Sequence, residues 1–114
     1  MNFAPLPSVN VAEVPADGRV MDVRENDEWV AGHVEGALHV PMSDFVARFG
    51  EVTEAVADGR RAHVMCRVGG RSAQVTQYLV QQGIDAVNID GGMLAWEGAE
   101  RPMVTENGTP AFVL

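Results

Sequence analysis

Short β-branched runs alternate with helix-like stretches along this chain of 114 residues. Val9 and Val11 alternate with polar residues, which predicts a strand within residues 8–14. RVMDV at 19–23 follows a PADG turn and predicts a second strand. Further strands are predicted in GALHVP, AHVM and AVNI, at residues 36–41, 62–65 and 86–89. This order of elements is typical of βα units around a mostly parallel sheet, so the predicted fold class is α/β.

The helical stretches between these strands have recognisable ends. ENDEWVA, at residues 25–31, stops at Gly32, and a helical periodicity over residues 72–82 stops at Gly83. Ser43 is predicted to be the N-cap of the DFVARF stretch. Shorter helices are predicted at residues 51–57 and 93–99.

The chain is expected to form one domain over residues 1–114. Its core is expected at about residues 8–104, with an extended C-terminal tail at 105–114. Both ends, APLP and TENGTPAFVL, are rich in turn-forming residues and are expected to lie along the surface. A chain of this length can bury one core without disulfides.

Composition favours a soluble protein. Hydrophobic residues make up 46% of the chain, but Gly, Pro and charges interrupt them, so no run approaches the roughly 20 apolar residues of a membrane span. The first residues, MNFAPLPSVNV, lack a basic segment followed by an apolar one, so no secretory signal is expected. The single cysteine fits a reducing cytoplasm, although a fragment of a secreted protein would look the same.

The charge balance restricts the partners. The net charge is -8, from sixteen acids against eight arginines with no lysine. This disfavours nucleic acids and anionic membranes as partners. Arg67 and Arg71 nevertheless flank the cysteine loop, and a small positive site on an acidic protein suggests a small anion.

The loop VMCRVGGRS contains that single cysteine. Cys66 ends a predicted strand just before a predicted helix, which is where α/β sheets bind ligands. The unpaired N–H groups of a helix start, two glycines and two arginines together form an anion cradle. The same field would stabilise a thiolate and lower the pKa of Cys66 below about 8.5. The loop therefore predicts a nucleophile beside an anion site.

A structural role for Cys66 is the alternative, because a lone cysteine at a strand end is commonly a small buried hydrophobe. His63 lies three positions earlier on the strand and points to the opposite face, so it is not expected to act as a base. His33 and His39 do not complete a zinc spacing with His63 and Cys66, and no metal or cofactor is expected. With one cysteine, a dithiol cycle within the chain is excluded.

Four blocks carry a resemblance that covers roughly residues 8 to 104. They are DVRENDEW at 22–29, GHVEGALHVP at 32–41, CRVGGRS at 66–72 and GGMLAW at 91–96. In their order and spacing the sequence resembles the rhodanese-like domain family, the single-domain sulfurtransferases. The resemblance implies a three-layer α/β domain with a central five-stranded, mostly parallel sheet flanked by helices.

The resemblance also implies a reaction. Cys66 would be the catalytic residue, taking a sulfane sulfur from a donor such as thiosulfate, becoming a persulfide and passing the sulfur to cyanide or a thiol. The implied partners are a small anionic sulfur donor and these acceptors, with a protein donor or acceptor as a further option. The implied substrate-binding loop, whose N–H groups would hold the terminal sulfur, is made of Arg67, Val68, Gly69, Gly70 and Arg71.

Loop length and one departure refine this expectation. Four residues separate Cys66 from Arg71. Related phosphatases and arsenate reductases have one residue more, so sulfur transfer is preferred. Relatives commonly carry Ser where this chain has Val68. Losing that hydroxyl would shift donor preference toward a less polar persulfide or polysulfide, or change nothing if the side chain points away.

The other blocks are interpreted mainly as structural. Asp22 and Arg24 lie near the expected ligand edge but are expected to form structural ion pairs. His33 is expected to tie a loop by hydrogen bonds. Trp29 is predicted to be a core residue on a helix face, and Trp96 a core residue or pocket wall.

Three functions follow from the sequence. The preferred one is a sulfurtransferase of the thiosulfate type. The second is a non-enzymatic persulfide carrier, partner-binding module or oxidant sensor. The third is a phosphatase or arsenate reductase, disfavoured by the loop length and the absent second cysteine. The sequence names neither the physiological donor and acceptor nor the pathway or oligomeric state.

Overall fold

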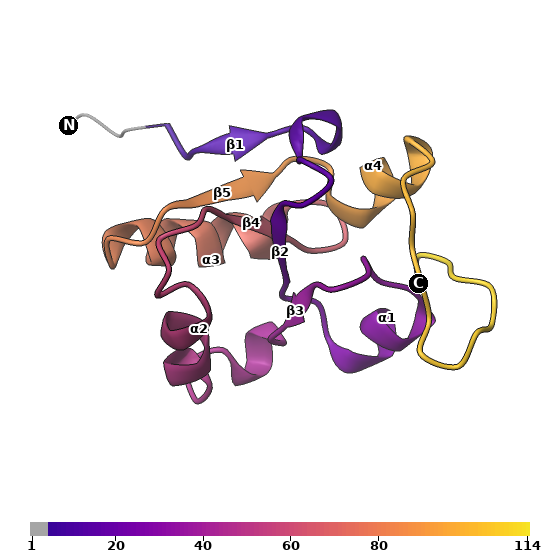
Figure 1. Ribbon diagram of the computed structural model, residues 1–114, viewed down its shortest axis with the longest axis horizontal. Coiled ribbons are helices and arrows are strands. Elements are labelled where there is room, and N and C mark those ends of the chain that lie inside the picture. The colour runs from indigo at the N-terminus through magenta and orange to yellow at the C-terminus, as the bar shows by residue number, and fades with distance from the viewer. Residues whose placement is uncertain (1–4) are drawn as a thin grey trace.

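The computed structural model describes residues 5–114 and contains a five-stranded sheet in the order β1-β5-β4-β2-β3. Each strand is parallel to its neighbours, and helices lie on both sides of the sheet (Figure 1). The predicted α/β class and five-stranded, mostly parallel sheet are therefore confirmed. The strands are β1 (Ser8–Val9), β2 (Arg19–Asp22), β3 (Leu38–His39), β4 (Ala62–Met65) and β5 (Ala86–Ile89).

Strand register brings the carboxyl ends of the central strands together. Asp22, the last residue of β2, pairs with Met65, the last residue of β4. The residues of β4 and β5 are all buried, since both faces of a parallel sheet are covered. The chain segments that follow β2 and β4 consequently leave the sheet at the same end, where the strands have their carboxyl termini.

Helices divide between the two faces of the sheet. On one face, Val64 of the sheet packs in a cluster with Val52 of α2 and Leu79 of α3. On the other face, Met65 packs with Met93 of α4. The result is three layers, as expected. The helices are α1 (Asn26–Ala31), α2 (Phe49–Ala55), α3 (Gly70–Gln81) and α4 (Gly92–Gly98), with 3₁₀ helices η1 (Val11–Glu13) and η2 (Met42–Asp44).

The first predicted strand is wrong beyond its second residue. It was expected within residues 8–14, but β1 ends at Val9 and η1 follows it. Asn10 caps η1, because its side-chain oxygen accepts from the N–H groups of Ala12 and Glu13 at 2.9 and 3.1 Å. The Glu13 carboxylate accepts from the Asn10 N–H in return, at 2.9 Å. This capping box outweighs the alternating pattern.

Two predicted helix starts are also wrong. Ser43 is not an N-cap: it lies inside η2, and its hydroxyl donates to the Glu25 carboxylate. The long helix begins at Gly70 rather than at residue 72, because Gly69 adopts a left-handed conformation (φ 115°) and serves as the N-cap of α3. Ser72 therefore lies in the first turn of α3 and not at its boundary.

The C-terminal segment 105–114 contains no helix or strand and runs beside α1 (Figure 1). Its Phe112 N–H donates to the carbonyl oxygen of Ala31 at 3.0 Å. Just before it, Val104 forms an antiparallel bridge with His33. Within residues 5–114, no helix combines the length and apolar character needed to cross a bilayer.

Candidate active site

Cys66 lies directly after β4, in the loop that leads into α3, and is 1% exposed. Its Sγ accepts a hydrogen bond from the Gly69 backbone N–H at 3.1 Å and one from the Ser72 hydroxyl at 3.3 Å. The left-handed conformation of Gly69 turns the chain so that α3 begins beside the sulfur. The sulfur thus faces the N-terminus of a twelve-residue helix.

These contacts change the acidity of the thiol. Burial raises the pKa of Cys66, while hydrogen bonds from the Ser72 hydroxyl and from the backbone N–H groups of Ser72, Gly69 and Val68 lower it. The hydrogen bonds outweigh burial, so the pKa lies below its ordinary value. The positive end of the α3 dipole acts in the same direction. A lowered pKa agrees with the expectation from the loop sequence, although the residue is also part of a hydrophobic cluster.

The start of α4 is hydrogen-bonded to the backbone of the cysteine loop. The Met93 N–H donates to the carbonyl oxygen of Cys66 at 2.9 Å, and the Leu94 N–H donates to that of Arg67 at 3.1 Å. Gly92 has a φ of 52°, and a Cβ at this position would lie 2.3 Å from the Cys66 carbonyl oxygen. The GGMLAW block therefore has to carry glycine where the helix approaches the loop.

Arg71 forms a bidentate ion pair with Glu28 of α1. Its Nη1 and Nη2 donate to Oε1 and Oε2 at 2.7 and 2.8 Å. The pair raises the pKa of Arg71 and lowers that of Glu28 through the hydrogen bonds between them. Sequence reasoning placed Arg71 at the site but missed the carboxylate that neutralises it, because the two residues are 43 positions apart in the chain.

Of the other predicted loop residues, all but Gly69 are exposed at the surface. Arg67 is exposed, and its Nε donates to the main-chain oxygen of Leu114, the last residue of the sequence, at 3.0 Å. Val68 is 55% exposed, while Gly70 is the first residue of α3. Gly69 is partly buried, and its carbonyl oxygen accepts from Asn88 Nδ2 at 3.3 Å.

Two polar residues that contact the loop were not predicted. Ser72 donates to the sulfur, and its position in the first turn of α3, six residues after the cysteine, is the signal that could have identified it. Asn88 of β5 holds the Gly69 carbonyl from the neighbouring strand. Its Oδ1 is buried without a partner among the described residues, and the sequence holds no comparable signal for it.

The DVR block is structural, as expected. Asp22 and Arg24 form an ion pair at 2.8 Å with both side chains fully buried. Arg24 also donates to the carbonyl oxygens of Glu28 at 3.1 Å and Gly32 at 2.8 Å. The pair therefore anchors α1 to the end of β2 and fixes the helix that carries the partner of Arg71.

The three histidines bond to groups other than Cys66. His63 is buried, with Nδ1 2.9 Å from the Arg19 carbonyl oxygen. Nδ1 of His33 lies 2.8 Å from the Trp29 carbonyl oxygen, so this histidine does tie a loop. Trp29 is not a core residue: it is half-buried and stacks between His33 and His39, at centroid distances of 3.7 and 4.4 Å.

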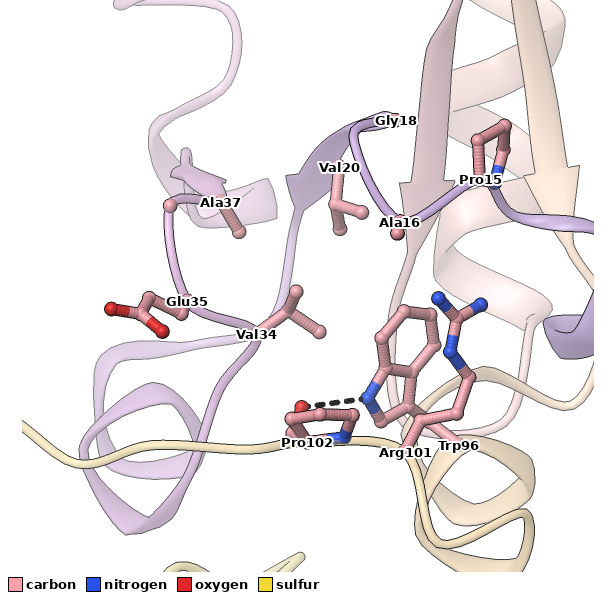
Figure 2. Close-up of a pocket in the computed structure, with 11 residues that line it drawn as sticks. Pro15, Ala16, Gly18, Val20, Val34, Glu35, Ala37, Trp96, Arg101 and Pro102 are labelled. Carbon is pink, nitrogen blue, oxygen red and sulfur yellow. Dashed lines mark hydrogen bonds between the residues drawn. The ribbon is translucent and has the colours of Figure 1, made fainter.

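A pocket of about 440 Å³ lies at the opposite end of the strands, where Gly18 precedes β2 (Figure 2). Trp96 forms part of its wall, and its indole N–H donates to the carbonyl oxygen of Pro102 at 3.0 Å. Arg101 stacks over this indole at 4.2 Å, and its Nη1 donates to two carbonyl oxygens in and after η1. Trp96 is therefore a pocket wall as predicted, but of a pocket away from Cys66.

Metal binding has no structural support in the part of the chain that is described. No group of three or more His, Cys, Asp or Glu side chains among residues 5–114 is placed to hold a metal ion.

Comparisons of this chain with family models, protein sequences and solved structures agree on one family. The family model of the rhodanese-like domain matches residues 10–99. YtwF of Bacillus subtilis is 39% identical over 83 residues, covering 73% of this chain and 77% of the relative. A sulfurtransferase of Allochromatium vinosum is 34% identical over 93 residues, covering 81% and 83%. The crystal structure of a rhodanese-related protein from Thermoplasma volcanium superposes with a TM-score of 0.78 at 27% identity, covering 88% of this chain and 99% of that one.

Proposed function

The chain belongs to the rhodanese-like domain family, and from this premise we propose that it is a sulfurtransferase with Cys66 as its nucleophile. The donor is a thiosulfate- or persulfide-type compound, and the acceptor is cyanide or a thiol. The proposed site occupies a single domain that spans residues 1–114. The loop around the transferred sulfur is made of Arg67, Val68, Gly69, Gly70 and Arg71.

The observation that carries this proposal is the position of the Cys66 sulfur at the start of α3. Hydrogen bonds from Gly69 and Ser72 support the thiolate, which is the reactive form of cysteine. The first N–H groups of α3 have no acceptor within the helix, and so they are available to a negatively charged sulfur. A persulfide anion formed on Cys66 would extend toward these donors.

In the proposed reaction, the Cys66 thiolate attacks the outer sulfur of the donor. A sulfur–sulfur bond forms to Cys66, and the bond within the donor breaks, releasing sulfite from thiosulfate or a thiolate from a persulfide. The acceptor then attacks the terminal sulfur and regenerates the Cys66 thiolate. No external base is required if the thiol is already ionised, which agrees with the histidines bonding elsewhere.

Intact-mass measurement after incubation with a sulfur donor tests this proposal. The expected product carries one additional sulfur, lost again on adding cyanide as thiocyanate forms. Cys66→Ser should carry none. A wild-type protein that gains no sulfur from thiosulfate, thiosulfonate or persulfide, or an adduct that survives in Cys66→Ser, would contradict it.

A persulfide carrier is the second candidate, favoured by the exposure of Val68 and Arg67 beside the sulfur, where a protein partner could dock. It predicts sulfur loading from a protein persulfide but negligible turnover with small donors. Steady-state thiocyanate production from a small donor would argue against a carrier. Hydrolysis of an aryl phosphate that disappears in Cys66→Ser would instead indicate a phosphatase.

A further inference from the structure

The positive charge beside Cys66 is smaller than the sequence suggests. The loop contains two arginines, but Arg71 is neutralised by the bidentate pair with Glu28. The pair is partly shielded from water, with the Glu28 side chain only 14% exposed. Arg67 has no Asp or Glu side-chain partner among the described residues, and its Nε donates to the main-chain oxygen of Leu114, the last residue of the sequence.

Glu28 is held in this position by its own helix. Its Oε1 accepts from the Glu25 N–H at 3.1 Å, which closes the capping box of α1. The buried Arg24 fixes the same helix by donating to the Glu28 carbonyl oxygen. Arg71 in turn interacts electrostatically with Cys66 and with Glu25. The charge state of the Glu28–Arg71 pair therefore acts on the space around the sulfur.

This arrangement bears on the donor. Thiosulfate brings two negative charges to a thiolate that already carries one. A site with at most one uncompensated arginine matches a monoanion better than a dianion, because unpaired charge is costly where water is partly excluded. Val68, an exposed aliphatic side chain in the loop, offers contact to an apolar substituent and no hydrogen bond.

We propose that Glu28, by neutralising Arg71, directs the enzyme away from dianionic thiosulfate and toward sulfane-sulfur donors with at most one negative charge, such as alkyl persulfides. This inference rests on the proposed sulfurtransferase function. Glu28 is a positioning residue, since it acts on the donor through Arg71.

The sulfur-transfer step is the same for each class of donor. With a neutral alkyl persulfide, the Cys66 thiolate attacks the terminal sulfur. The new bond yields a Cys66 persulfide that retains the donor's proton, and the alkyl thiolate departs with the electron pair. With methanethiosulfonate, which is thiosulfate with one oxygen anion replaced by methyl, the leaving group is methanesulfinate. With thiosulfate it is sulfite, a dianion.

The test compares thiosulfate with methanethiosulfonate, two donors of nearly equal size that differ by one charge. The value of kcat/KM for thiocyanate formation is measured for each donor and divided by its uncatalysed rate with cyanide. Wild type should favour the monoanion by about tenfold. Glu28→Gln, which keeps the shape of the side chain, should raise the thiosulfate/methanethiosulfonate ratio by about tenfold. Glu51→Gln, which opens the exposed Arg48–Glu51 pair and removes the same charge elsewhere, should leave the ratio unchanged.

Three results would overturn the inference. One is a normalised wild-type preference for thiosulfate, a measurement that does not depend on any variant folding. Another is a Glu28→Gln protein whose kcat/KM values for the two sulfur donors change by the same factor, which indicates a merely structural role. The third is a Glu51→Gln protein in which the thiosulfate/methanethiosulfonate ratio rises as much as in Glu28→Gln, which indicates an effect of net charge alone. If the wild type gains no sulfur from either donor or from an alkyl persulfide, the sulfurtransferase proposal itself fails, and this outcome is distinct from an altered ratio.

Discussion

Replacing Ser72 with alanine should raise the pKa of Cys66 and slow its reactions at neutral pH. The substitution removes one oxygen atom, which donates to the Cys66 Sγ at 3.3 Å from a fully buried side chain. Alanine suits a helix, so the first turn of α3 should be retained. The Gly69 N–H still donates to the sulfur at 3.1 Å, so the thiolate loses one of its donors and not all of them.

The size of the effect follows from the contact. A hydrogen bond to a charged group contributes about 1.5–3 kcal/mol, and one pKa unit corresponds to about 1.4 kcal/mol. The distance to Ser72 is ordinary for a sulfur acceptor, so the lower part of this range applies and the expected rise is about one unit. At a pH below the wild-type pKa, the thiolate fraction, and with it the alkylation rate, should fall about tenfold.

The assay is the pH dependence of Cys66 alkylation by iodoacetamide, read by intact mass. Thr76→Val is the matched control, because Thr76 is another fully buried hydroxyl of α3 that donates to the Ser72 carbonyl oxygen instead of the sulfur. Its alkylation curve should coincide with that of the wild type. A Ser72→Ala curve that coincides with the wild type, or moves to lower pH, would refute the hydrogen-bond argument.

Three further predictions concern stability. Gly92→Ala should cost about 2–5 kcal/mol in urea unfolding, since a Cβ would lie 2.3 Å from a loop carbonyl at a positive φ, whereas Gly98→Ala, with open space around it, should stay within about 0.5 kcal/mol. Arg24→Met should cost about 3–5 kcal/mol by leaving Asp22 buried and unpaired, and adding Asp22→Asn should recover part of the loss. The folded-state pKa of Cys66 lies below its unfolded value of about 8.5. The thiolate should therefore stabilise the fold fully at pH values above about 8.5, and progressively less as the pH falls through the folded-state pKa. Cys66→Ala should remove this pH dependence from the free energy of unfolding.

Several elements could be predicted because a local pattern determines them. The buried runs of β2, β4 and β5 are continuous in the sequence, and burial on both faces of a parallel sheet requires this. The loop at Cys66 was recognisable because glycines between a strand and a helix serve a backbone turn, and Gly69 has the left-handed φ that such a turn uses.

Other features depend on contacts that no local pattern encodes. The alternating valines suggested that β1 would extend to residue 14, but a three-residue capping interaction by Asn10 ends it. Glu28 lies in the acidic ENDE run at the start of α1, where a side chain is commonly solvated, and only the fold, which places α1 near the first turn of α3, brings it to Arg71. The stacking of Trp29 on two histidines depends in the same way on where the chain folds back.

The site separates two physical effects that the sequence presented as one. Uncharged hydrogen-bond donors lower the pKa of Cys66, namely the Ser72 hydroxyl and the backbone N–H groups whose orientation the helix fixes. The charged groups, Arg71 and Glu28, largely cancel each other and act on the field met by an incoming donor. Loss of the Ser72 hydroxyl should consequently slow the reaction of Cys66 with every sulfur donor by one common factor at neutral pH. Loss of the Glu28 charge should change the ratio between donors and move the alkylation curve of Cys66 much less. If both variants moved the curve by the same amount, charge and hydrogen bonding would act on the thiol together, and donor choice could not be altered without altering reactivity.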